Sequence, residues 1–512
     1  MTIKEKITQL LAELAGGESF SVEIPPQKDG FGDYTSNLPL RLATKKKESP
    51  LKIGQEIIQK LPETDFLAQK TVVPPGFLHF FLKKEWLVEA LGEILKQGED
   101  YGKSRSGKGQ SILIEFLSAN PTGPLTLGNG RGGFLGDFLA QLFEFLGFKV
   151  TREYYVNDMG TQIENLGRSV LGEKGEGLYQ GEYIEALKQK IKSQSPKEAG
   201  QKAAQLILTQ LIQKTVKKAK IQFDSWVLES EIVRSGLVEK VIAELKQKNL
   251  VYRKDGALWF CASRFQDDKD RVLVKQNGEY TYFLTDIAYH LNKLQRGYHR
   301  LINIWGADHH GDVNRMLAAA EVFGFKERLT LILHQFVSLT QEGEQVKMSK
   351  RAGRYLTLDQ LIDEVGLDAV RFFYLSKSTD THLDFDLEKA KAQSLQNPVY
   401  YIQYVSARCH SLLEKAKGVL PVKPDIPSHP AEIRLLKKLI HFPDLLQEIA
   451  LHFQAYRLPN YLLELADSFH RFYEECPVLE EKNAGRLALV LATRMVLENG
   501  LRLMKIEAPK RM

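Results

Sequence analysis

Apolar and polar residues follow three different patterns along the chain, and each pattern predicts a different kind of structure. The first hundred residues open with an amphipathic helix, followed by a turn-rich stretch and then by VVPPGFLHFFL, a short run typical of a strand. Between about residues 105 and 390, strand-like runs such as SILIEFL, LINIWGA and LTLILHQFVSL alternate with helices, which indicates a parallel α/β sheet. Beyond that, apolar residues recur every three or four positions and predict a helical bundle.

Length and composition agree with several folded domains. At roughly 150 residues per domain, 512 residues predict three or four domains, and 43% apolar with 26% charged residues excludes wholesale disorder. The most apolar stretch, from Gly132 to Val150, is interrupted by Asp137 and Glu144, so we expect no membrane span. The first residues mix charges into their apolar face, unlike a signal peptide.

The three cysteines predict neither a disulfide scaffold nor a structural zinc site. They lie far apart and form no CxxC or His/Cys cluster, which favours a reducing compartment. They are Cys261, Cys409 and Cys476.

The charge pattern singles out one segment. A net charge of +6 is too small to identify a nucleic-acid partner. Between residues 188 and 220, however, nine lysines face one acid, Glu198. Two interpretations stay open: solvated helix faces, or a surface that contacts phosphates. The lysines are Lys188, Lys190, Lys192, Lys197, Lys202, Lys214, Lys217, Lys218 and Lys220.

The first motif that carries chemistry is EFLSANPTGPLTLGNGRGGFLGDFLAQLF, from Glu115 to Phe143. It predicts a strand, a loop and a helix that begins near Gly128. The first turn of a helix has unpaired N–H groups and a partial positive charge, which suit a phosphate. The glycines leave room for a ligand or for another part of the backbone, so tight packing is the alternative interpretation.

The second motif is KMSKR, Lys347 to Arg351, in a glycine-flanked stretch. Three cations within five residues predict a clamp that neutralises the charge developing on a pyrophosphate leaving group. By composition alone, any exposed basic loop has the same character.

Together the two motifs resemble the signature pair, HIGH and KMSK, of class I aminoacyl-tRNA synthetases. Longer strings resemble the arginyl-tRNA synthetases in particular, and the resemblance covers essentially the whole chain in order. These strings are GDYTSN, PPGFLHFF, SANPTGPL, GNGRG, EYYVNDMGTQI, QDDKDRVLVK, YTYFLTDIAYHLNK, WGADHHGDVNR, NPVYYIQYVSAR and IEAPKRM.

The resemblance implies a fold and an activity. The fold is an N-terminal α+β domain over residues 1–100, a Rossmann-like α/β catalytic domain with insertions over 101–390, and an all-α anticodon-binding bundle over 391–512. The activity is activation of L-arginine with ATP and Mg²⁺, followed by transfer to the 3′-terminal adenosine of tRNA(Arg). We expect a cytoplasmic monomer. The alternatives are a class I synthetase for another amino acid, or a catalytically weak relative that binds tRNA.

One departure from the family lies in the first signature. Thr126 and Asn129 stand where HIGH has its two histidines, so the motif reads TLGN. Both side chains still donate hydrogen bonds, but neither can be cationic. The resemblance makes them catalytic together with Lys347 and Lys350. It also implies an ATP site formed by Pro121, Thr122, Gly123, Gly128, Gly130, Gly306, Asp308, His309, Met348 and Ser349.

The arginine site follows partly from charge. Guanidinium is planar and always cationic, so a selective site needs carboxylates. Glu115 ends the strand before the first motif, and Tyr282 and Asp286 are four apart, on one face of a helix start. By resemblance Asp286 pairs with the guanidinium, beside Tyr282, while Glu115 and Asn120 hold the α-amino side. Alternatively, Asp286 complements the helix dipole and Tyr282 is a core aromatic. The resemblance adds Ser118 and His310.

The remaining candidates are less distinctive. Adjacent residues of WGADHHG point apart, which argues against a metal site. Aromatics interleaved with a cation in YYIQYVSAR fit base stacking, or alternatively a stripe of the bundle core. By resemblance, the tRNA-binding residues are Phe77, His79, Tyr401, Tyr404 and Arg408.

Overall fold

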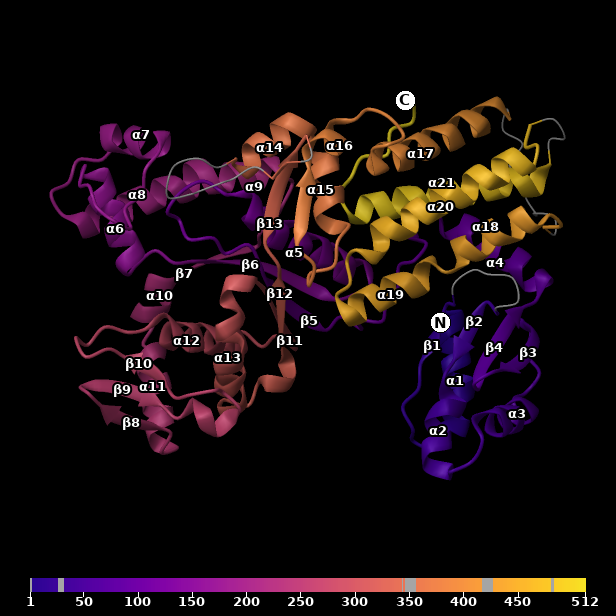
Figure 1. The fold of residues 1–512 in the computed structure, drawn as a ribbon, viewed down its shortest axis with the longest axis horizontal. Helices are drawn as coiled ribbons and strands as arrows, with labels where there is room; N and C mark the ends of the chain where they lie inside the picture. Colours follow the sequence, from indigo (N-terminus) through magenta and orange to yellow (C-terminus); the bar gives the residue numbers. More distant parts are fainter. Residues whose placement is uncertain (1, 26–31, 343, 346–355, 417–426, 480–482) are drawn as a thin grey trace.

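The computed structural model describes residues 2–25, 32–342, 344–345, 356–416, 427–479 and 483–512. Figure 1 shows three parts: an N-terminal sheet domain in indigo, a central α/β region, and a helical bundle in orange to yellow. This arrangement confirms the predicted multidomain fold class. No described helix has the length and apolar character needed to cross a membrane.

The N-terminal part is a four-stranded antiparallel sheet, in the order β1-β2-β4-β3, with three helices. Its first helix begins at a capping box between Thr2 and Glu5 and buries Ile3, Ile7 and Leu11, as the amphipathic pattern predicted. The elements are α1 (Ile3–Ala15), β1 (Val22–Glu23), β2 (Tyr34–Ser36), α2 (Leu38–Lys46), α3 (Pro50–Lys60), β3 (Leu67–Val73) and β4 (Phe77–Leu82).

The central sheet is parallel throughout, in the order β12-β11-β5-β6-β7. The chain starts at β5, builds outward through β6 and β7, and then returns to the other side of β5. The order therefore reverses between β5 and β11, which is where ligands bind in doubly wound sheets. The strands are β5 (Ser111–Glu115), β6 (Lys149–Val156), β7 (Ser225–Leu228), β11 (Arg300–Gly306) and β12 (Leu329–His334).

One strand-like run of the sequence divides into two strands. LTLILHQFVSL forms β12 and then β13, which belongs to a separate sheet, because the buried Arg131 guanidinium binds the carbonyls of Gln335 (2.9 Å) and Phe336 (3.3 Å) between them. That small sheet consists of β13 (Val337–Gln341), β14 (Glu344–Gln345) and β15 (Leu383–Asp386).

The helix of the first motif, α5 (Leu127–Phe145), is buried on nearly every side. A Cβ at Gly136 would lie 2.1 Å from the Phe116 ring, so only glycine lets α5 pack this closely on the loop after β5. Helices α12 (Tyr282–Gln295) and α13 (His310–Val322) lie beside the central sheet, through Tyr289 on Glu153 of β6 and through contacts with β12, and α15 (Leu367–Leu375) packs on α5.

Two insertions extend from the sheet, toward the left of Figure 1. The first lies between β6 and β7 and is helical; the second follows β7 and carries a three-stranded antiparallel sheet, β10-β9-β8. Their elements are α6 (Thr161–Val170), α7 (Glu182–Lys190), α8 (Pro196–Ile207), a π-helical turn (Leu208–Ile212), α9 (Gln213–Lys218), α10 (Glu229–Arg234), α11 (Leu237–Gln247), β8 (Val251–Lys254), β9 (Ala257–Phe260) and β10 (Arg271–Val274).

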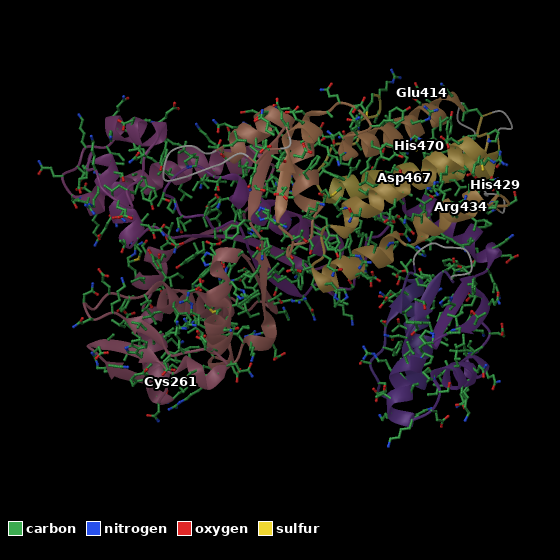
Figure 2. The ribbon with its side chains drawn as sticks, viewed as in Figure 1. Cys261, Glu414, His429, Arg434, Asp467 and His470 are labelled. Atoms are coloured by element: carbon green, nitrogen blue, oxygen red, sulfur yellow. The ribbon has the colours of Figure 1, made fainter. Side chains whose placement is uncertain are left out.

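The C-terminal part is a bundle of helices, as predicted, and α4, from before the sheet, packs against it. Its cysteines Cys409 and Cys476, like Cys261 in the second insertion (Figure 2), are buried. The helices of this part are α17 (Pro398–Lys415), α18 (Pro430–Ile440), α19 (Phe442–His452), α20 (Arg457–Glu475) and α21 (Ala484–Leu503), with α4 (Lys84–Gln97) against them. Before them in the chain, α16 (Leu387–Lys391) packs on β13 of the small sheet, and α14 (Leu358–Val365) packs on α5, α15 and α16.

Buried polar contacts join the bundle to its neighbours. Toward the N-terminal domain, the Tyr34 hydroxyl donates to Asp444 Oδ2 at 2.7 Å. Toward α5, the fully buried Asp137 accepts hydrogen bonds from Arg371 (2.9 Å) and Lys505 (2.7 Å). The second cluster therefore ties the first-motif helix to the end of the chain.

Candidate active site

The loop after β5 begins in a constrained turn. Leu117 and Ser118 have positive φ values of 69° and 29°. The Ser118 hydroxyl donates to Glu115 Oε1 (3.0 Å) and accepts from the Tyr155 N–H (3.1 Å). These two contacts hold the turn between β5 and β6, and so fix the direction in which the loop leaves the sheet.

The first motif starts α5 as predicted, one residue before Gly128. Thr126 is the N-cap, and both its N–H and its hydroxyl donate to Asn129 Oδ1 at 2.9 Å. The two residues at the histidine positions therefore form a reciprocal cap. The NH₂ group of Asn129 remains as a donor on the first turn, beside the N–H groups of the helix.

The sequence left two interpretations for the glycines of this helix, room for a ligand or close packing. Different glycines fit each of them. A Cβ at Gly128 would meet nothing closer than Thr126 Oγ1, at 3.9 Å. At Gly130 it would lie 3.0 Å from Leu358, and at Gly132 it would lie 2.9 Å from His334 Nε2. Gly128 therefore leaves open space at the helix start, whereas Gly130 and Gly132 allow close packing. The ATP-binding role predicted for Gly128 and Gly130 stays a prediction.

The second motif lies outside the described residues, and with it Lys347, Met348, Ser349 and Lys350. The segment that follows it is described, and it lies beside the first motif. The Leu358 N–H donates to the Leu125 carbonyl at 2.9 Å, and Thr357 pairs with Thr126 in an isolated β-bridge. Two motifs far apart in sequence are thus joined by their flanks.

The first insertion covers the loop between β5 and α5. The Tyr183 hydroxyl donates to the Thr122 carbonyl at 2.9 Å, and a Cβ at Gly123 would lie 3.2 Å from that hydroxyl. Asn120 Nδ2 donates to Gln162 Oε1 at 2.8 Å, whereas Pro121 is buried. These contacts with α6 and α7 hold the loop in position.

At the end of β11, the candidates Asp308, His309 and His310 are exposed. A Cβ at Gly306 would lie 2.4 Å from Asp308 Oδ1, so glycine is needed for that carboxylate to lie over the strand end. His309 Nδ1 lies 2.8 Å from Asp312 Oδ2. Among the described residues, no three His, Cys, Asp or Glu side chains are grouped to hold a metal ion.

Sequence reasoning missed His334, which ends β12 next to this edge. Its Nε2 faces Gly132 of α5, and burial lowers the pKa of its imidazole to about 4. It is therefore a neutral ring at neutral pH. The signal in the sequence was its position at the carboxyl end of a parallel strand.

The arginine candidates Tyr282 and Asp286 lie on the first turns of α12, as their spacing predicted. Tyr282 is 51% exposed, which excludes the core-aromatic alternative. The side chain of Asp286 is 30% exposed.

A second carboxylate near Asp286 was missed. Glu229 starts α10 directly after β7, is 2% exposed, and accepts from Thr285 Oγ1 (2.8 Å) and Asn157 Nδ2 (3.0 Å). Burial, with smaller effects of Asp158 and Asp286, raises the pKa of its carboxyl. The signal was again an acid at the end of a strand.

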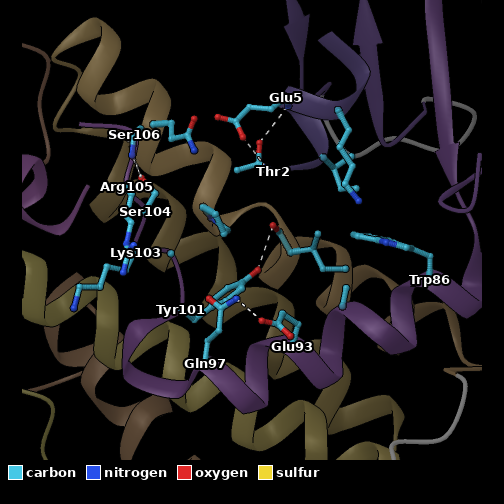
Figure 3. Close-up of a pocket in the computed structure, with 17 residues that line it drawn as sticks. Thr2, Glu5, Trp86, Glu93, Gln97, Tyr101, Lys103, Ser104, Arg105 and Ser106 are labelled. Carbon is cyan, nitrogen blue, oxygen red and sulfur yellow. Dashed lines mark hydrogen bonds between the residues drawn. The ribbon is translucent and has the colours of Figure 1, made fainter. Parts of the chain in front are cut away.

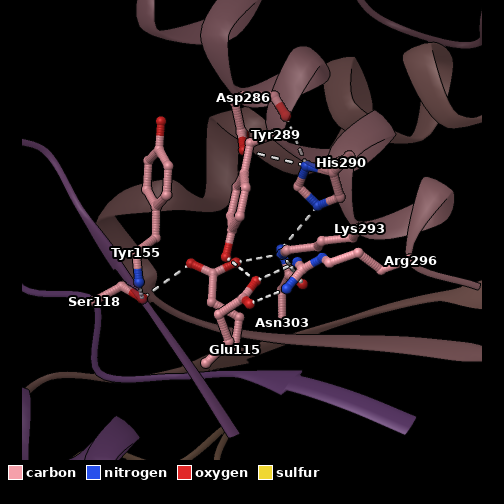
Figure 4. Close-up of polar contacts among 10 residues, drawn as sticks. Glu115, Ser118, Tyr155, Asp286, Tyr289, His290, Lys293, Arg296 and Asn303 are labelled. Atoms are coloured by element: carbon pink, nitrogen blue, oxygen red, sulfur yellow. Dashed lines mark hydrogen bonds and ion pairs between the residues drawn. The ribbon is translucent and has the colours of Figure 1, made fainter. Parts of the chain in front are cut away.

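Glu115 has a cationic partner inside the protein (Figure 4). Its Oε2 accepts from the fully buried Lys293 Nζ at 2.6 Å. Its negative charge is thereby balanced without a substrate. Its role in arginine binding stays a prediction.

The candidate tRNA residues of the N-terminal sheet differ in access. Phe77 lines a hollow of about 490 Å³ together with Asn37, Arg41 and Thr44. His79 is buried, with its Nδ1 facing the Gly32 N–H at 3.3 Å, so its ring lies below the surface.

In the bundle, half-buried rings line the junction of α17 and α20. His470 stacks on Tyr401 and Tyr404, with ring centroids 5.3 and 6.3 Å apart, and Arg408 lies 4.3 Å from the Tyr473 centroid. His470 and Asp467 mark this face in Figure 2. The rings lie at the edge of the bundle core and are only half-buried. They therefore combine features of both interpretations, a base-stacking surface and a stripe of the core.

The lysine-rich segment forms α7 to α9. Four of its lysines pair with carboxylates, and Lys218 pairs with Asp359 (3.0 Å) and Asp363 (2.7 Å) of α14, close after the second motif. The other three are Lys188, Lys202 and Lys220. Lys190, Lys192, Lys197, Lys214 and Lys217 are exposed.

A separate cavity of about 350 Å³ lies among α1, α4, α19 and the segment from Tyr101 to Ser106 (Figure 3). No residue predicted for the site lines it. It belongs to the junction between the N-terminal domain and the bundle.

Comparison with known proteins gives three consecutive family matches. "Arginyl tRNA synthetase N terminal domain" matches residues 1–82, "tRNA synthetases class I (R), catalytic domain" matches 90–189 and 173–401, and "DALR anticodon binding domain" matches 402–512. Together these models span nearly the whole chain.

Individual relatives agree with the family models. The arginine–tRNA ligase of Carboxydothermus hydrogenoformans is 43% identical, over 96% of this chain and 94% of its own. The arginyl-tRNA synthetase structure from Thermus thermophilus has a TM-score of 0.81 and 25% identity, over 100% of this chain and 99% of its own. A putative arginyl-tRNA synthetase from Campylobacter jejuni has a TM-score of 0.77 and 36% identity, over 84% of this chain and 100% of its own.

Proposed function

The chain belongs to the arginyl-tRNA synthetases of class I, and from that premise we propose how its own residues perform the activity. It is a ligase that converts L-arginine and ATP to arginyl-adenylate and pyrophosphate, and transfers the arginyl group to tRNA(Arg). The observation that carries the site assignment is the start of α5 at the switch point of the sheet, hydrogen-bonded to the segment that follows KMSKR.

In the first step, an arginine carboxylate oxygen attacks the α-phosphorus of ATP, and pyrophosphate leaves. The nucleophile comes from the substrate, so the protein's contribution is positioning and charge stabilisation. We place the phosphates at the first turn of α5, where the helix N–H groups and the Asn129 NH₂ group donate. Asp308 is placed to accept from a ribose hydroxyl.

Positive charge for the pyrophosphate comes from two sources in this proposal. One is the pair Lys347 and Lys350 of the second motif, whose cations neutralise the leaving group; the described segment after that motif pairs with Thr126 through Thr357. ATP arrives as its Mg²⁺ complex, which neutralises phosphate oxygens when bound. The donors gathered at α5 are N–H groups, so they fit the phosphate and not the cation.

For arginine selection, we propose that Asp286 and Glu229 hold the guanidinium. Asp286 contributes to the raised pKa of the Glu229 carboxyl, and Glu229 in turn contributes to the raised pKa of Tyr282, which supports placing these side chains near one another. Two acids can share the five donors of a planar guanidinium, whereas a lysine ammonium is a compact point charge. Ser118, Asn120 and His310 complete the proposed site.

For tRNA, we propose contacts on all three parts of the molecule. Phe77 and its hollow meet the elbow, and Tyr401, Tyr404 and Arg408, together with His470, meet anticodon bases. The exposed lysines of α7 to α9 belong to the insertion that contacts the catalytic loop through Tyr183 of α7 and Thr122. They therefore suit the phosphates of the acceptor arm.

We further propose domain borders near residues 100 and 390, a monomer, and a cytoplasmic location. In support, the family models match residues 1–82, 90–401 in two overlapping segments, and 402–512.

The decisive experiment is ATP–pyrophosphate exchange with arginine, with and without tRNA(Arg). We expect exchange with arginine and none above background with lysine. Exchange with a different amino acid would assign another specificity. A protein that binds tRNA(Arg) but shows no exchange under either condition would be the non-catalytic relative, whose motivation is the TLGN sequence.

A further inference from the structure

A buried chain of polar side chains runs from the proposed guanidinium site to the end of β5 (Figure 4). It begins at Asp286, continues through His290 and Asn303, and ends at Lys293 and Glu115. His290, Lys293 and Asn303 are each 0% exposed. Nothing in the adenylate chemistry requires His290, Asn303 or Lys293 to touch a substrate, so their burial calls for another role.

The direction of every hydrogen bond in this chain follows from Lys293, which can only donate. Its Nζ donates to Glu115 Oε2 (2.6 Å) and to Asn303 Oδ1 (3.1 Å). With its oxygen occupied as an acceptor, Asn303 presents its Nδ2 to His290 Nε2 at 2.9 Å. An amide NH₂ group donates, so His290 Nε2 must be the acceptor.

The remaining ring nitrogen must then carry the proton. His290 Nδ1 lies 2.8 Å from the backbone oxygen of Asp286 and 3.2 Å from its Oδ1. Both are acceptors, so Nδ1–H donates to them. The imidazole is thus a neutral ring with its proton on Nδ1. Phe325 stacks on the ring at a centroid distance of 6.0 Å and an interplanar angle of 11°, which keeps it in place.

Neutrality of this ring matters for the acid beside it. A doubly protonated His290 would form an ion pair with Asp286 and compete with the guanidinium for the same carboxylate. A neutral ring orients the carboxylate by one hydrogen bond and leaves its charge for the substrate. The positive charge of Lys293 is balanced by Glu115, which lies farther from the guanidinium than Asp286 does.

We infer that His290 is a positioning residue for arginine selection, and that Asn303 and Lys293 hold it as the neutral Nδ1–H tautomer, so that it orients Asp286 without neutralising it. This inference rests on the proposed function, because it takes the guanidinium as the partner of Asp286. It adds three buried residues to the determinants of arginine affinity.

The first test compares two substitutions at one position. In His290→Asn the amide nitrogen takes the place of Nδ1 and still donates to Asp286. In His290→Gln the amide oxygen takes the place of Nε2 and accepts from Asn303, and no donor is left in the place of Nδ1 for Asp286. We expect the KM for arginine to rise about 10- to 100-fold in His290→Gln, the range for a lost hydrogen bond to a charged group. In His290→Asn it should rise about threefold or less. Equal KM values for arginine in the two variants would overturn the inference.

The second test replaces the hydrogen-bond donor of residue 303 that faces His290 with an acceptor, in a side chain of nearly the same shape. In Asn303→Asp both oxygens accept, so His290 must donate from Nε2 and becomes cationic beside Asp286. We expect the KM for arginine to rise at least tenfold, with the KM for ATP and the kcat at saturating arginine nearly unchanged. Asn292→Asp adds the same negative charge on α12, outside this series of hydrogen-bonded side chains. It should leave the KM for arginine, the KM for ATP and the kcat unchanged. A parallel rise of both KM values would indicate general damage and contradict the inference.

A third measurement needs no variant to be active. Nitrogen-15 NMR of histidine-labelled protein distinguishes the two neutral tautomers and the cation, and the His290 signal is identified by its loss in His290→Asn. We expect Nδ1 protonated and Nε2 unprotonated at neutral pH. The opposite tautomer, or a cation, overturns the inference even if arginine exchange is normal. Absence of exchange in the wild type with the expected tautomer would instead count against the proposed function.

Discussion

At the scale of single residues, the site contains side chains that serve the fold and the chemistry at once. Thr126 and Asn129 cap α5 through each other, and Asn129 still offers an NH₂ group to a phosphate. An alanine at either position therefore mixes two effects: loss of a cap, about 1 kcal/mol, and loss of a donor. A useful substitution separates them.

Asn129→Asp makes that separation. The carboxylate keeps the oxygen that accepts from Thr126, so α5 stays capped, and a negative charge in the first turn even suits the helix dipole. It removes the NH₂ donor and repels phosphate, so we expect kcat for adenylate formation to fall by about 100-fold or more, from a lost charge-assisted bond plus repulsion. The melting temperature should stay within a degree or two of wild type. Pyrophosphate exchange and thermal melting measure the two effects, and unchanged exchange would remove Asn129 from the phosphate site.

Asp286→Asn addresses the guanidinium directly. A desolvated cation that loses its carboxylate costs about 3–5 kcal/mol, so kcat/KM for arginine should fall by about two to four orders of magnitude. Glu279→Gln, an exposed acid just before α12, is the matched control and should change little. If Asp286→Asn keeps its arginine affinity, Glu229 becomes the principal partner.

Residue-level prediction from sequence succeeded where spacing alone decides. Tyr282 and Asp286 share a face because four residues make about one helical turn. Glu229 could not be found this way, since its approach to Asp286 depends on how α10 packs against α12. His290 has the same four-residue spacing from Asp286, but its contact with Asn303 depends on how β11 packs against α12. The partner of Glu115 was likewise unpredictable, because a fully buried lysine is contrary to ordinary residue statistics.

At the scale of elements, the strands and helices followed the apolar pattern closely, and the deviations have local causes. The predicted strand LTLILHQFVSL divides because Arg131, from a neighbouring helix, takes the carbonyls at the break. No pattern within the run itself contains that information. Packing between elements also creates titrating groups that a pattern cannot reveal, as at α19.

The contact between α19 and β2 should depend on pH. Burial raises the pKa of Asp444 to about 6, from 3.8. Between these values the folded protein keeps a proton that the unfolded chain has released, so this residue's contribution to stability falls as pH rises. Asp444→Asn still accepts from Tyr34 and has no such penalty. Relative to wild type it should gain about 2–3 kcal/mol between pH 4 and pH 7.

Thermal melting of both proteins across that range measures the effect, because other titrating groups cancel in the difference. The melting temperature of Asp444→Asn should rise relative to wild type as pH increases. A difference that is constant with pH would show that Asp444 titrates normally.

At the scale of the whole molecule, the three patterns of the sequence predicted three parts in the right order. They could not predict how the parts are joined, because a joint depends on residues distant in the chain. Asp137, Arg371 and Lys505 form one such joint, with Asp137 between two cations. The apolar run from Gly132 to Val150, which Asp137 interrupts, is the body of α5, and that acid is what connects it to the bundle.

The effects of substitutions at this joint on the stability of the protein should be strongly non-additive. Asp137→Asn leaves the fully buried Arg371 and the partly buried Lys505 without their carboxylate and should destabilise the protein by about 3–5 kcal/mol. Adding Lys505→Met removes one of those cations, so the double variant should be more stable than Asp137→Asn alone. Lys505→Met by itself should cost less than Asp137→Asn. Denaturation midpoints of the four proteins give the coupling, and simple additivity would mean that the three residues act independently.

The burial of the three cysteines has a practical consequence for following motion in solution. A thiol reagent can modify Cys261, Cys409 or Cys476 only after the surrounding structure opens, so each modification rate reports a local opening equilibrium. Cys261 reports on the second insertion, and the other two report on the bundle. Burial raises the pKa of the Cys409 thiol, which slows its reaction further. Labelling rates measured with and without arginine, ATP or tRNA would therefore show how each ligand changes local opening in the two regions separately. The measurement needs no substitution.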